Sequence, residues 1–239
     1  NWDIFDSIDD ENDAKVDQII RLIQYLKCLP VKVVSIDKVE ADDIIAYMSK
    51  DMAKRFNTKS YIVSSDRDFL QLVDDNVTVY RPIEREFYDP RTVKEKFGII
   101  PQNFIHYKVL VGDASDKVPG IKGLGKKGVL KRFPELGEGE LEFDQLFKIS
   151  EQKLKNSVVY ARVIQDWDKL LNTKKIMDLS EPMLSEKEKQ DLSQLTEEPL
   201  NELRILEFMS LYNEDGMTHI IKNTEFWLKD TFTRLVYDA

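Results

Sequence analysis

Three short apolar runs, interrupted by an amphipathic helical stretch, constrain the fold of this chain most. Residues 31–36, 60–64 and 77–80 each read as a strand, and residues 40–56 carry apolar side chains at helical spacing. Strands that alternate with helices are typical of an α/β layer built on a mainly parallel sheet. We therefore expect an α/β fold in the first hundred residues, with a mainly parallel sheet flanked by helices.

Only helical patterns follow Pro90. We expect a helix over residues 101–111, a loop punctuated by Gly, Asp and Pro over residues 112–125, and a short helix over residues 126–133. Apolar residues between positions 14 and 26 also recur at helical spacing. The segment Ser185-Glu186-Lys187-Glu188 predicts a capping box at the start of a later helix. We therefore divide the chain into residues 1–100, the α/β portion, and residues 101–239, a helical region with a helix–hairpin–helix motif at 101–133 and C-terminal helices after it.

Composition indicates the class of protein and its compartment. No apolar run among the 239 residues approaches the length of about 18 residues that crosses a membrane. The opening Asn1-Trp2-Asp3 and the acidic residues after it do not resemble a secretory signal. Cys28 is the only cysteine, so no intramolecular disulfide can form, which fits a reducing compartment. We expect a cytoplasmic protein with no membrane segment.

Charge is segregated along the chain. The net charge of −9 argues against a nucleic-acid partner, but residues 117–132 hold six basic residues and no acidic one. A basic footprint for phosphates beside an acidic pit for cations is typical of proteins that act on nucleic acid with bound metal ions. A mosaic of ordinary solvated charge is the alternative. The six basic residues are Lys117, Lys122, Lys126, Lys127, Lys131 and Arg132.

Three clusters of carboxylates accompany the expected elements. The first lies at the start of the helix predicted from residue 40, where the helix N-terminus relieves part of the repulsion among its acids. The second directly follows the strand at 60–64, where residues i and i+2 of an extended chain point the same way. The third lies in the glycine-containing loop, where residues one helical turn apart would share a face. The clusters are Glu40, Asp42 and Asp43; Asp66 and Asp68; and Asp113 and Asp116.

Each cluster alone has an ordinary explanation: first-turn acids, a polar turn that caps a helix, and a common turn sequence. Together, seven carboxylates with neither His nor Cys nearby form an all-oxygen ligand set, which favours Mg²⁺ or Mn²⁺ over zinc. Two ions held by shared carboxylates suit phosphodiester hydrolysis, because one activates the attacking water and both stabilise charge on the phosphate. A calcium loop fits poorly, since the segment from Asp66 lacks the glycine required at the sixth loop position.

The glycine-containing segment at residues 118–127 predicts a turn that contacts the backbone of a nucleic acid. Its glycines permit left-handed turns and close approach of the chain to a ligand. A helix opened by Gly125 would offer free N–H groups to a phosphate, in a manner independent of base sequence. A surface loop with chance lysines is the alternative. The predicted DNA-binding residues are Lys117, Lys122, Gly123, Gly125, Lys126, Lys127 and Lys131.

These motifs, taken in order, resemble those of the structure-specific 5′-nucleases. They are EADD at 40–43, SDRD at 65–68, GDASD at 112–116 and VPGIKGLG at 118–125, and the similarity spans roughly residues 30–135. The family includes flap endonucleases, the 5′-nuclease domain of bacterial DNA polymerase I and phage 5′-exonucleases. The helical tail is most similar in type to the phage ribonuclease H enzymes, which implies the host cytoplasm if the chain is phage-encoded.

The resemblance implies a PIN-like α/β fold and a 5′-nuclease that acts on 5′ ends, flaps and RNA primers. Its partners would be branched or nicked duplex DNA, RNA–DNA hybrids and replication proteins. A K⁺ ion would lie at the glycine hairpin, held by main-chain carbonyls, in addition to two Mg²⁺ or Mn²⁺ ions. By motif match, Glu40, Asp42 and Asp43 would serve the first metal centre, Asp66 and Asp68 would lie between the centres, Asp113 and Asp116 would serve the second, and catalysis would rest on Asp43, Asp66, Asp68 and Asp113.

The sequence departs from the family pattern at its N-terminus. Family members begin with a strand that carries a metal-binding aspartate, followed by a basic arch and another such aspartate, and nothing in this sequence corresponds to them. We expect a fragment, or a chain whose N-terminal segment is supplied in trans, with low activity on its own. Two rival classes stay open: a non-catalytic DNA-clamping module, and a haloacid-dehalogenase-type phosphatase, which Leu70 disfavours because that family has a small Thr or Val there.

We predict that Mg²⁺ or Mn²⁺ raises the melting temperature of the protein, because either cation would relieve the repulsion among the carboxylates and bind only the folded state. Asp66→Asn or Asp113→Asn should remove much of that rise. Thermal melts with and without each cation measure the effect. A wild-type melting temperature that neither cation shifts, matched by both variants, would exclude the metal site.

Overall fold

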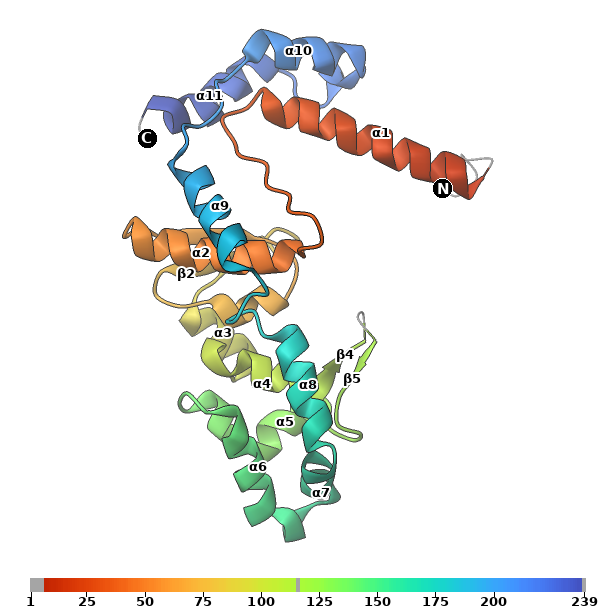
Figure 1. The fold of residues 1–239 in the computed structure, drawn as a ribbon, viewed down its shortest axis with the longest axis vertical. Helices are drawn as coiled ribbons and strands as arrows, with labels where there is room; N and C mark the ends of the chain where they lie inside the picture. The colour runs from red at the N-terminus through yellow and green to blue at the C-terminus, as the bar shows by residue number, and fades with distance from the viewer. Residues whose placement is uncertain (1–6, 115–116, 238–239) are drawn as a thin grey trace. The chain divides into compact units, whose positions relative to one another are not determined.

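The computed structural model describes residues 7–114 and 117–237 (Figure 1). Chain contacts divide the protein into two units: unit 1 comprises Asn1–Ile36 and Gln190–Ala239, and unit 2 comprises Asp37–Lys189. Residue 100, the boundary between the predicted α/β and helical portions, lies inside unit 2. All the described residues of the three carboxylate clusters and of the glycine-containing loop therefore belong to unit 2.

A small mixed sheet forms one part of unit 2. It has the strand order β1-β2-β3, with β1 at Ser60–Val63, β2 at Val77–Arg81 and β3 at Glu86–Tyr88. Strands β1 and β2 are parallel, whereas β2 and β3 are antiparallel, with Val79 opposite Tyr88. The strands at 60–64 and 77–80 are confirmed, but the mainly parallel sheet is not observed. Strand β3 escaped prediction because only three residues pair, and a run that short carries no readable alternation.

Residues 31–36 do not form a strand, contrary to the prediction. Their polar groups contact the irregular segment of unit 1 at residues 198–201: Asn201 Nδ2 donates to Val31 O at 2.9 Å, and Lys32 Nζ donates to Glu198 O at 2.6 Å. A strand persists only where a neighbouring strand takes up its backbone N–H and C=O groups. Residues 31–36 are irregular because Val31 O and Lys32 Nζ bond to residues 198–201 and not to a neighbouring strand.

The two helices expected over residues 40–56 and 126–133 begin and end close to the predicted positions, as α2 and α5. Helix α2 buries Ile44, Ala46 and Ala53 toward the core. The helix expected over residues 101–111 is split into a short 3₁₀ turn and α4. The helices are α2 at Ala41–Arg55, α3 at Pro90–Phe97, α4 at Phe104–Val111, α5 at Lys126–Arg132, α6 at Phe143–Gln152, α7 at Val158–Gln165 and α8 at Trp167–Met177, with 3₁₀ turns η2 at Asp68–Leu72, η3 at Pro101–Asn103, η4 at Pro134–Gly137 and η5 at Leu154–Asn156.

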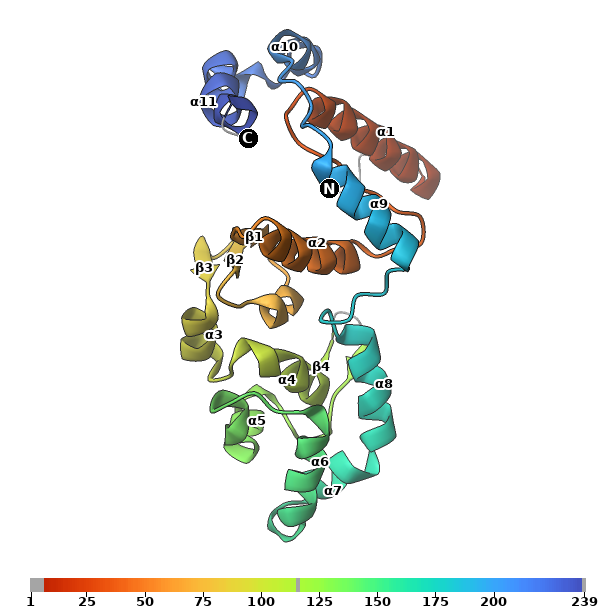
Figure 2. The ribbon, with the colours of Figure 1, turned by 60° about the vertical axis from the view of Figure 1, so that its left-hand side comes forward.

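Helix α4 is buried along nearly its whole length. Every residue from Phe104 to Leu110 is buried, and α4 lies beside α8 in both ribbon views (Figures 1 and 2). The fully buried Asn103 holds the entry to α4: its Nδ2 donates to Leu136 O at 2.9 Å, and its Oδ1 accepts from Leu141 N at 2.9 Å. Core burial on all sides and this hydrogen-bonded anchor fix the position of α4 in unit 2.

The segment after α4 forms a small hairpin in place of the expected loop. Strand β4 at Gly112–Asp113 pairs antiparallel with β5 at Val118–Pro119. Gly112 has φ +79°, and a Cβ atom on Gly120 would lie 2.1 Å from the carbonyl oxygen of Val111. Only glycine permits such a close approach of two backbones. Asp113 is therefore in a strand, and the helical face that it was expected to share with Asp116 involves a residue outside the described part of the chain.

Unit 1 consists of helices around a small core. Its helices are α1 at Ile8–Lys27, α10 at Ile205–Glu214 and α11 at Thr224–Tyr237, and α9 at Glu186–Glu197 leads into it from unit 2. The predicted capping box of α9 is confirmed, because Glu188 N donates to Ser185 Oγ and Ser185 N donates to Glu188 Oε2. The buried core of unit 1 is formed by Cys28, Leu29, Phe208, Tyr212 and Leu228.

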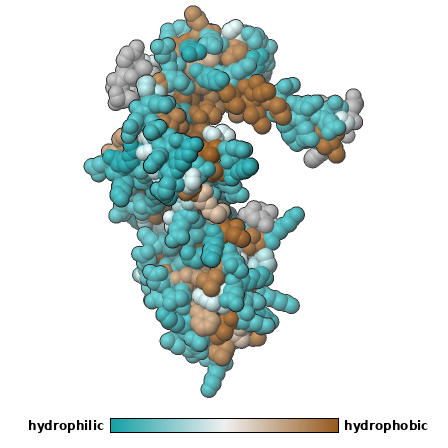
Figure 3. All heavy atoms as spheres, viewed as in Figure 1, coloured by the Kyte–Doolittle hydropathy of each residue, from teal (hydrophilic) through white to brown (hydrophobic). Residues whose placement is uncertain are grey.

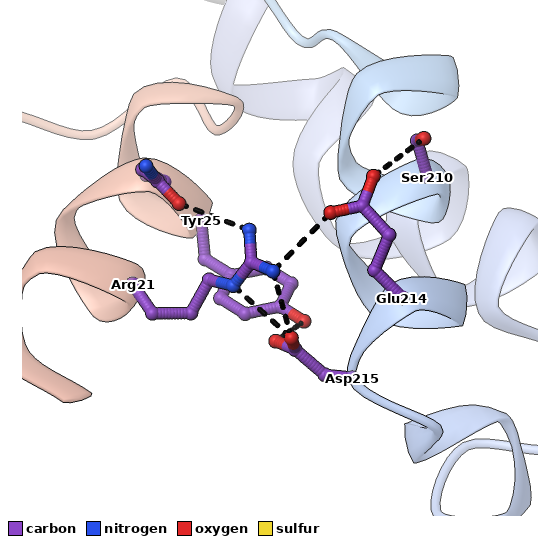
Figure 4. Close-up of polar contacts among 6 residues, drawn as sticks. Arg21, Tyr25, Ser210, Glu214 and Asp215 are labelled. Atoms are coloured by element: carbon purple, nitrogen blue, oxygen red, sulfur yellow. Dashed lines mark hydrogen bonds and ion pairs between the residues drawn. The ribbon is translucent and has the colours of Figure 1, made fainter. Parts of the chain in front are cut away.

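A polar cluster joins α1 to the end of α10 within unit 1 (Figure 4). Arg21 Nη2 lies 2.9 Å from Asp215 Oδ1 and 3.2 Å from Glu214 Oε2, and Tyr25 OH donates to Asp215 Oδ2 at 2.6 Å. Burial and the bond to Asp215 raise the pKa of Tyr25. Helix α1 also leaves apolar side chains such as Ile19 and Ile20 exposed, and apolar surface covers the half of α1 that leads into Lys27 (Figure 3). None of the described helices combines the length and hydropathy needed to cross a membrane.

We predict that Gly120→Ala lowers the free energy of unfolding by about 2–4 kcal/mol, because its Cβ would force the hairpin away from Val111. Gly125→Ala is the matched control, since nothing lies within 4 Å of a Cβ there. It should change stability by less than about 0.5 kcal/mol. Urea unfolding of the two variants measures both values, and equal stabilities would contradict the packing of the hairpin.

Candidate functional site

The first turn of α2 presents the first carboxylate cluster. Glu40 is the exposed N-cap residue, Asp42 is half-buried and Asp43 is buried. Asp43 Oδ1 accepts a hydrogen bond from Met183 N at 2.8 Å, so this carboxylate holds the chain after α8. Burial, together with the charges of Asp66 and Asp68, raises the pKa of Asp42. Asp42 therefore interacts electrostatically with the carboxylates of the second cluster.

The second cluster lies in a tight turn rather than in extended chain. Asp66 N donates to Ser64 Oγ at 3.1 Å, and Asp68 N donates to Asp66 Oδ1 at 2.8 Å. This turn leads directly into η2, whose first residue is Asp68. The expectation that the i and i+2 carboxylates converge by strand geometry is therefore wrong, because Asp66 uses one carboxylate oxygen to cap the N–H of Asp68.

Lys108 joins the second cluster to the third. This lysine on α4 is only 9% exposed, and its ammonium contacts the carboxylates of both Asp68 and Asp113. Burial raises the pKa of Asp68, and Lys108 opposes that rise. Burial also lowers the pKa of Lys108, but the contacts with Asp113 and Asp68 raise it overall. The ammonium therefore stays charged, as a buried lysine does only when it is paired.

The described carboxylates do not form a closed ligand cage. Among the residues the structure describes, no three Asp, Glu, His or Cys side chains lie in an arrangement that could hold a metal ion. The donor chemistry nonetheless fits a hard cation, since the charged groups that act on Asp42 are all carboxylates: Asp66, Asp68, Glu40 and Asp43. Lys108 shows that positive charge is accommodated between Asp68 and Asp113. Asp116, predicted as a further ligand, lies outside the described residues.

A pocket of about 850 Å³ opens between the second cluster and the hairpin. Carboxylates and basic side chains both line it, together with the aromatic rings of Phe97, Phe104 and Tyr107. The pocket would thus receive a ligand that carries negative charge and an apolar or aromatic part. Its charged lining residues are Asp66, Arg67, Arg81, Lys108, Asp113, Lys117 and Lys126.

Arg81 supports the turn that carries Asp66 and Asp68. It ends strand β2 and is 6% exposed. Its Nη2 donates to Ser65 O at 2.7 Å, its Nη1 lies 2.5 Å from Glu84 Oε1, and its guanidinium lies over the ring of Tyr88. Because Ser65 immediately precedes Asp66, this hydrogen bond fixes the backbone from which both carboxylates project.

The glycine-containing loop and the helix after it present their lysines to solvent. Two hydrogen bonds brace the loop: Arg162 Nη1, on α7, donates to Lys122 O at 2.7 Å, and Ile121 N donates to Leu110 O at 2.9 Å. The backbone is therefore held in place while the ammonium groups stay free to meet a ligand. The exposed lysines are Lys117, Lys122, Lys126, Lys127 and Lys131.

Two residues of the site, Lys108 and Arg81, escaped sequence reasoning. A signal for Lys108 was available, since a single lysine within the apolar run 104–111 is either exposed on one helix face or buried with a partner. The signal for Arg81 was weaker. It follows two inward-facing valines, Val77 and Val79, at the period of a strand, so its side chain points inward with theirs.

Comparison with known proteins gives a family match. Residues 10–98 match the model of the 5′-3′ exonuclease N-terminal resolvase-like domain. A 5′-3′ exonuclease of Buchnera aphidicola is 33% identical over 145 residues, which cover 61% of this chain and 50% of that protein. DNA polymerase I of Bacillus subtilis is 37% identical over 130 residues, which cover 52% of this chain and 14% of that protein. The chain thus spans half the length of the first of these relatives and a small part of the second.

A solved structure shares the fold. The flap endonuclease D15 of bacteriophage T5, in a complex with DNA and metal ions, superposes with a TM-score of 0.57 at 21% identity. The match covers 69% of this chain and 62% of that one. This chain therefore shares its fold with that structure.

We predict that Arg81→Met lowers the free energy of unfolding by about 1–3 kcal/mol, because Ser65 O loses its buried donor. Arg91→Met is the control, since Arg91 makes an exposed ion pair with Glu95. That variant should match the wild type, because exposed pairs contribute little. Chemical denaturation of both variants is the measurement, and a stable Arg81→Met variant would show that the turn does not depend on Arg81.

Proposed function

We propose that the chain belongs to the 5′-nuclease family, whose N-terminal domain model matches residues 10–98, and that it is a divalent-metal-dependent 5′-nuclease. Its substrates are 5′ ends, flaps or RNA primers on duplex DNA, and its reaction is phosphodiester hydrolysis in replication or repair. One observation carries the proposal: carboxylates of two clusters and basic residues of the glycine-containing loop line the same pocket. A phosphodiester needs both, since positive groups bind it and acid-held cations promote its hydrolysis.

The proposed metal ligands lie around the first turn of α2, the turn before η2 and the start of β4. Two Mg²⁺ or Mn²⁺ ions, when bound, would activate a water and stabilise charge on the phosphate. The residues that would hold them are Glu40, Asp42, Asp43, Asp66, Asp68, Asp113 and Asp116. Solved relatives of the fold that contain metal ions support a divalent cation here.

Several residues around the pocket would position the phosphodiester. Arg81 holds the turn of Asp66 and Asp68 through Ser65 O. Helix α4 is buried and ends at Val111, so it fixes the position at which β4 and its Asp113 begin. Lys117 and Lys126 line the pocket and would contact phosphate oxygens. In this proposal, these groups would align the scissile phosphate against the acid cluster without themselves reacting.

We propose further that the helix–hairpin–helix motif binds the backbone of duplex DNA. Helices α4 and α5 flank the hairpin, and the exposed lysines between Lys117 and Lys131 would track a phosphate backbone. A K⁺ ion held by main-chain carbonyls of the loop is part of the same proposal. Similarity to DNA polymerase I supports a replication setting, with branched or nicked DNA and RNA–DNA hybrids as substrates and replication proteins as neighbours.

One observation favours a second candidate function, a DNA-clamping module that does not cleave. Lys108 already pairs with Asp68 and Asp113, and the described carboxylates do not form a closed cage. A protein of this kind would bind branched DNA through the lysines and leave it intact. Binding without cleavage in Mg²⁺ separates it from the nuclease.

We predict that the protein on its own cleaves a 5′-flap substrate only slowly in Mg²⁺, and that Asp66→Asn and Asp113→Asn each lower this rate further by about a hundredfold or more, since the loss of a ligand misplaces the reacting groups. The assay follows product from an end-labelled flap under single-turnover conditions. Glu95→Gln, which alters an exposed carboxylate of α3 outside the pocket, is the control. Undiminished binding with no product from the wild type would favour the clamping module.

We predict that binding of flap DNA falls steeply with salt, because phosphate contacts release counterions. Replacing Lys126 and Lys127 by alanine should lower the slope of log affinity against log salt by about one for each phosphate that is no longer bound. Replacing Lys148 and Lys175, exposed lysines outside the pocket and the loop, is the control. Fluorescence anisotropy in a cleavage-deficient background measures the slopes, and an unchanged slope in the first variant would place the DNA elsewhere.

A further inference from the structure

Lys108 differs from the other lysines discussed above in what it contacts. Its ammonium reaches two carboxylates that come from separate elements, Asp68 at the start of η2 and Asp113 in β4. Lys174, by comparison, pairs with Asp178 one helical turn away along the same segment. An intrahelical pair needs no particular tertiary arrangement, whereas the contacts of Lys108 hold two parts of the fold together.

We propose that Lys108 is an internal counter-ion that occupies the position between Asp68 and Asp113 until a divalent cation displaces it. This inference rests on the proposed function of the site. The lysine then controls loading of that position with metal, and it makes loading sensitive to anions in the adjoining pocket.

Charge balance supports the exchange. The charges of Asp68 and Asp113 sum to −2, which one divalent cation matches in full and one ammonium matches by half. Asp66 contributes further negative charge at Asp68. In a site that is largely buried, this difference acts through a low effective dielectric and is not screened as it would be on the surface. The position thus accepts a divalent cation in place of the ammonium.

The pocket offers a place for the displaced ammonium. Lys108 is among its lining residues, together with Arg81, Lys117 and Lys126. These cations repel a free ammonium unless an anion lies among them. A phosphate group in the pocket would therefore favour release of Lys108, and release of Lys108 would favour the phosphate. Bound metal therefore raises the affinity for phosphate, and bound phosphate raises the affinity for metal by the same factor.

Chemical labelling of the wild-type protein tests the displacement without altering the site. Acetic anhydride modifies accessible lysines, and mass spectrometry measures the extent at each one. Labelling of Lys108 should rise several-fold when Mn²⁺ is added, and rise further with inorganic phosphate. Lys174, whose partner Asp178 is also buried, should label equally in all conditions. Unchanged labelling of Lys108 at saturating Mn²⁺ would overturn the proposal.

Mn²⁺ affinity of the Lys108→Met variant provides the second test. Removal of the competing ammonium should tighten one Mn²⁺ site by about tenfold or more, since a buried ion pair no longer has to be broken. Lys174→Met, which breaks an ion pair away from the cluster, should bind Mn²⁺ like the wild type. Calorimetric titration of the full chain measures all three proteins.

The outcomes separate this inference from the proposed function. Wild type and Lys108→Met that bind Mn²⁺ equally well would overturn the counter-ion role and leave the nuclease proposal standing. Weaker binding by Lys108→Met would also overturn it, because the lysine would then support the site rather than compete for it. Failure of both proteins to bind Mn²⁺ would overturn the metal-dependent function together with the inference.

Discussion

Burial of helix α4 is the constraint on which the rest of unit 2 depends. The helix is apolar almost all round, and it packs against α8, α5 and η2. Such a helix has no face to offer to solvent, so other elements must enclose it. Its one lysine, Lys108, is enclosed with it, and the chain can bury that charge only by bringing acids to it. The positions of Asp68 and Asp113 follow from the packing of α4.

The candidate site combines opposing charges in a way that simple packing would avoid. A buried ion pair is weak support for stability, because desolvation offsets much of the attraction between the charges. Burial, together with the charges of Asp66 and Asp68 nearby, nevertheless raises the pKa of Asp42. Clusters of like charge with shifted pKa values are typical of functional sites. The arrangement is better explained by a cation-binding role than by a contribution to folding.

Sequence patterns predicted those parts of the fold that local chemistry decides. Helix α2 and strands β1 and β2 follow from apolar periodicity, and the capping box at Ser185 follows from side-chain hydrogen bonding alone. Residues 31–36 show the limit of such reasoning. Their composition suits a strand, but strand formation depends on a neighbour, and apolar content does not reveal whether one is present.

The site shows the same division between local and tertiary information. The motifs singled out the acids, because their types and spacing are visible in the chain. The turn at Asp66, the commitment of Asp43 to Met183 N and the bridging role of Lys108 depend on contacts that the spacing of residues does not reveal. Arg81 could be placed facing inward from strand periodicity, but its bond to Ser65 O requires the fold. The sequence shows which residue types are present, whereas the contacts among these side chains are known only from the fold.

The central claim is that the carboxylates gathered around α2, the turn before η2 and β4 bind divalent cations. Anomalous diffraction from crystals soaked in Mn²⁺ tests it most directly, because the signal locates the metal without assumptions about activity. The account predicts Mn²⁺ within about 2.0–2.6 Å of oxygens of Asp66, Asp68 or Asp113, with the Lys108 ammonium moved away from the occupied position. Mn²⁺ peaks only at other surfaces, with Lys108 still between Asp68 and Asp113, would contradict it.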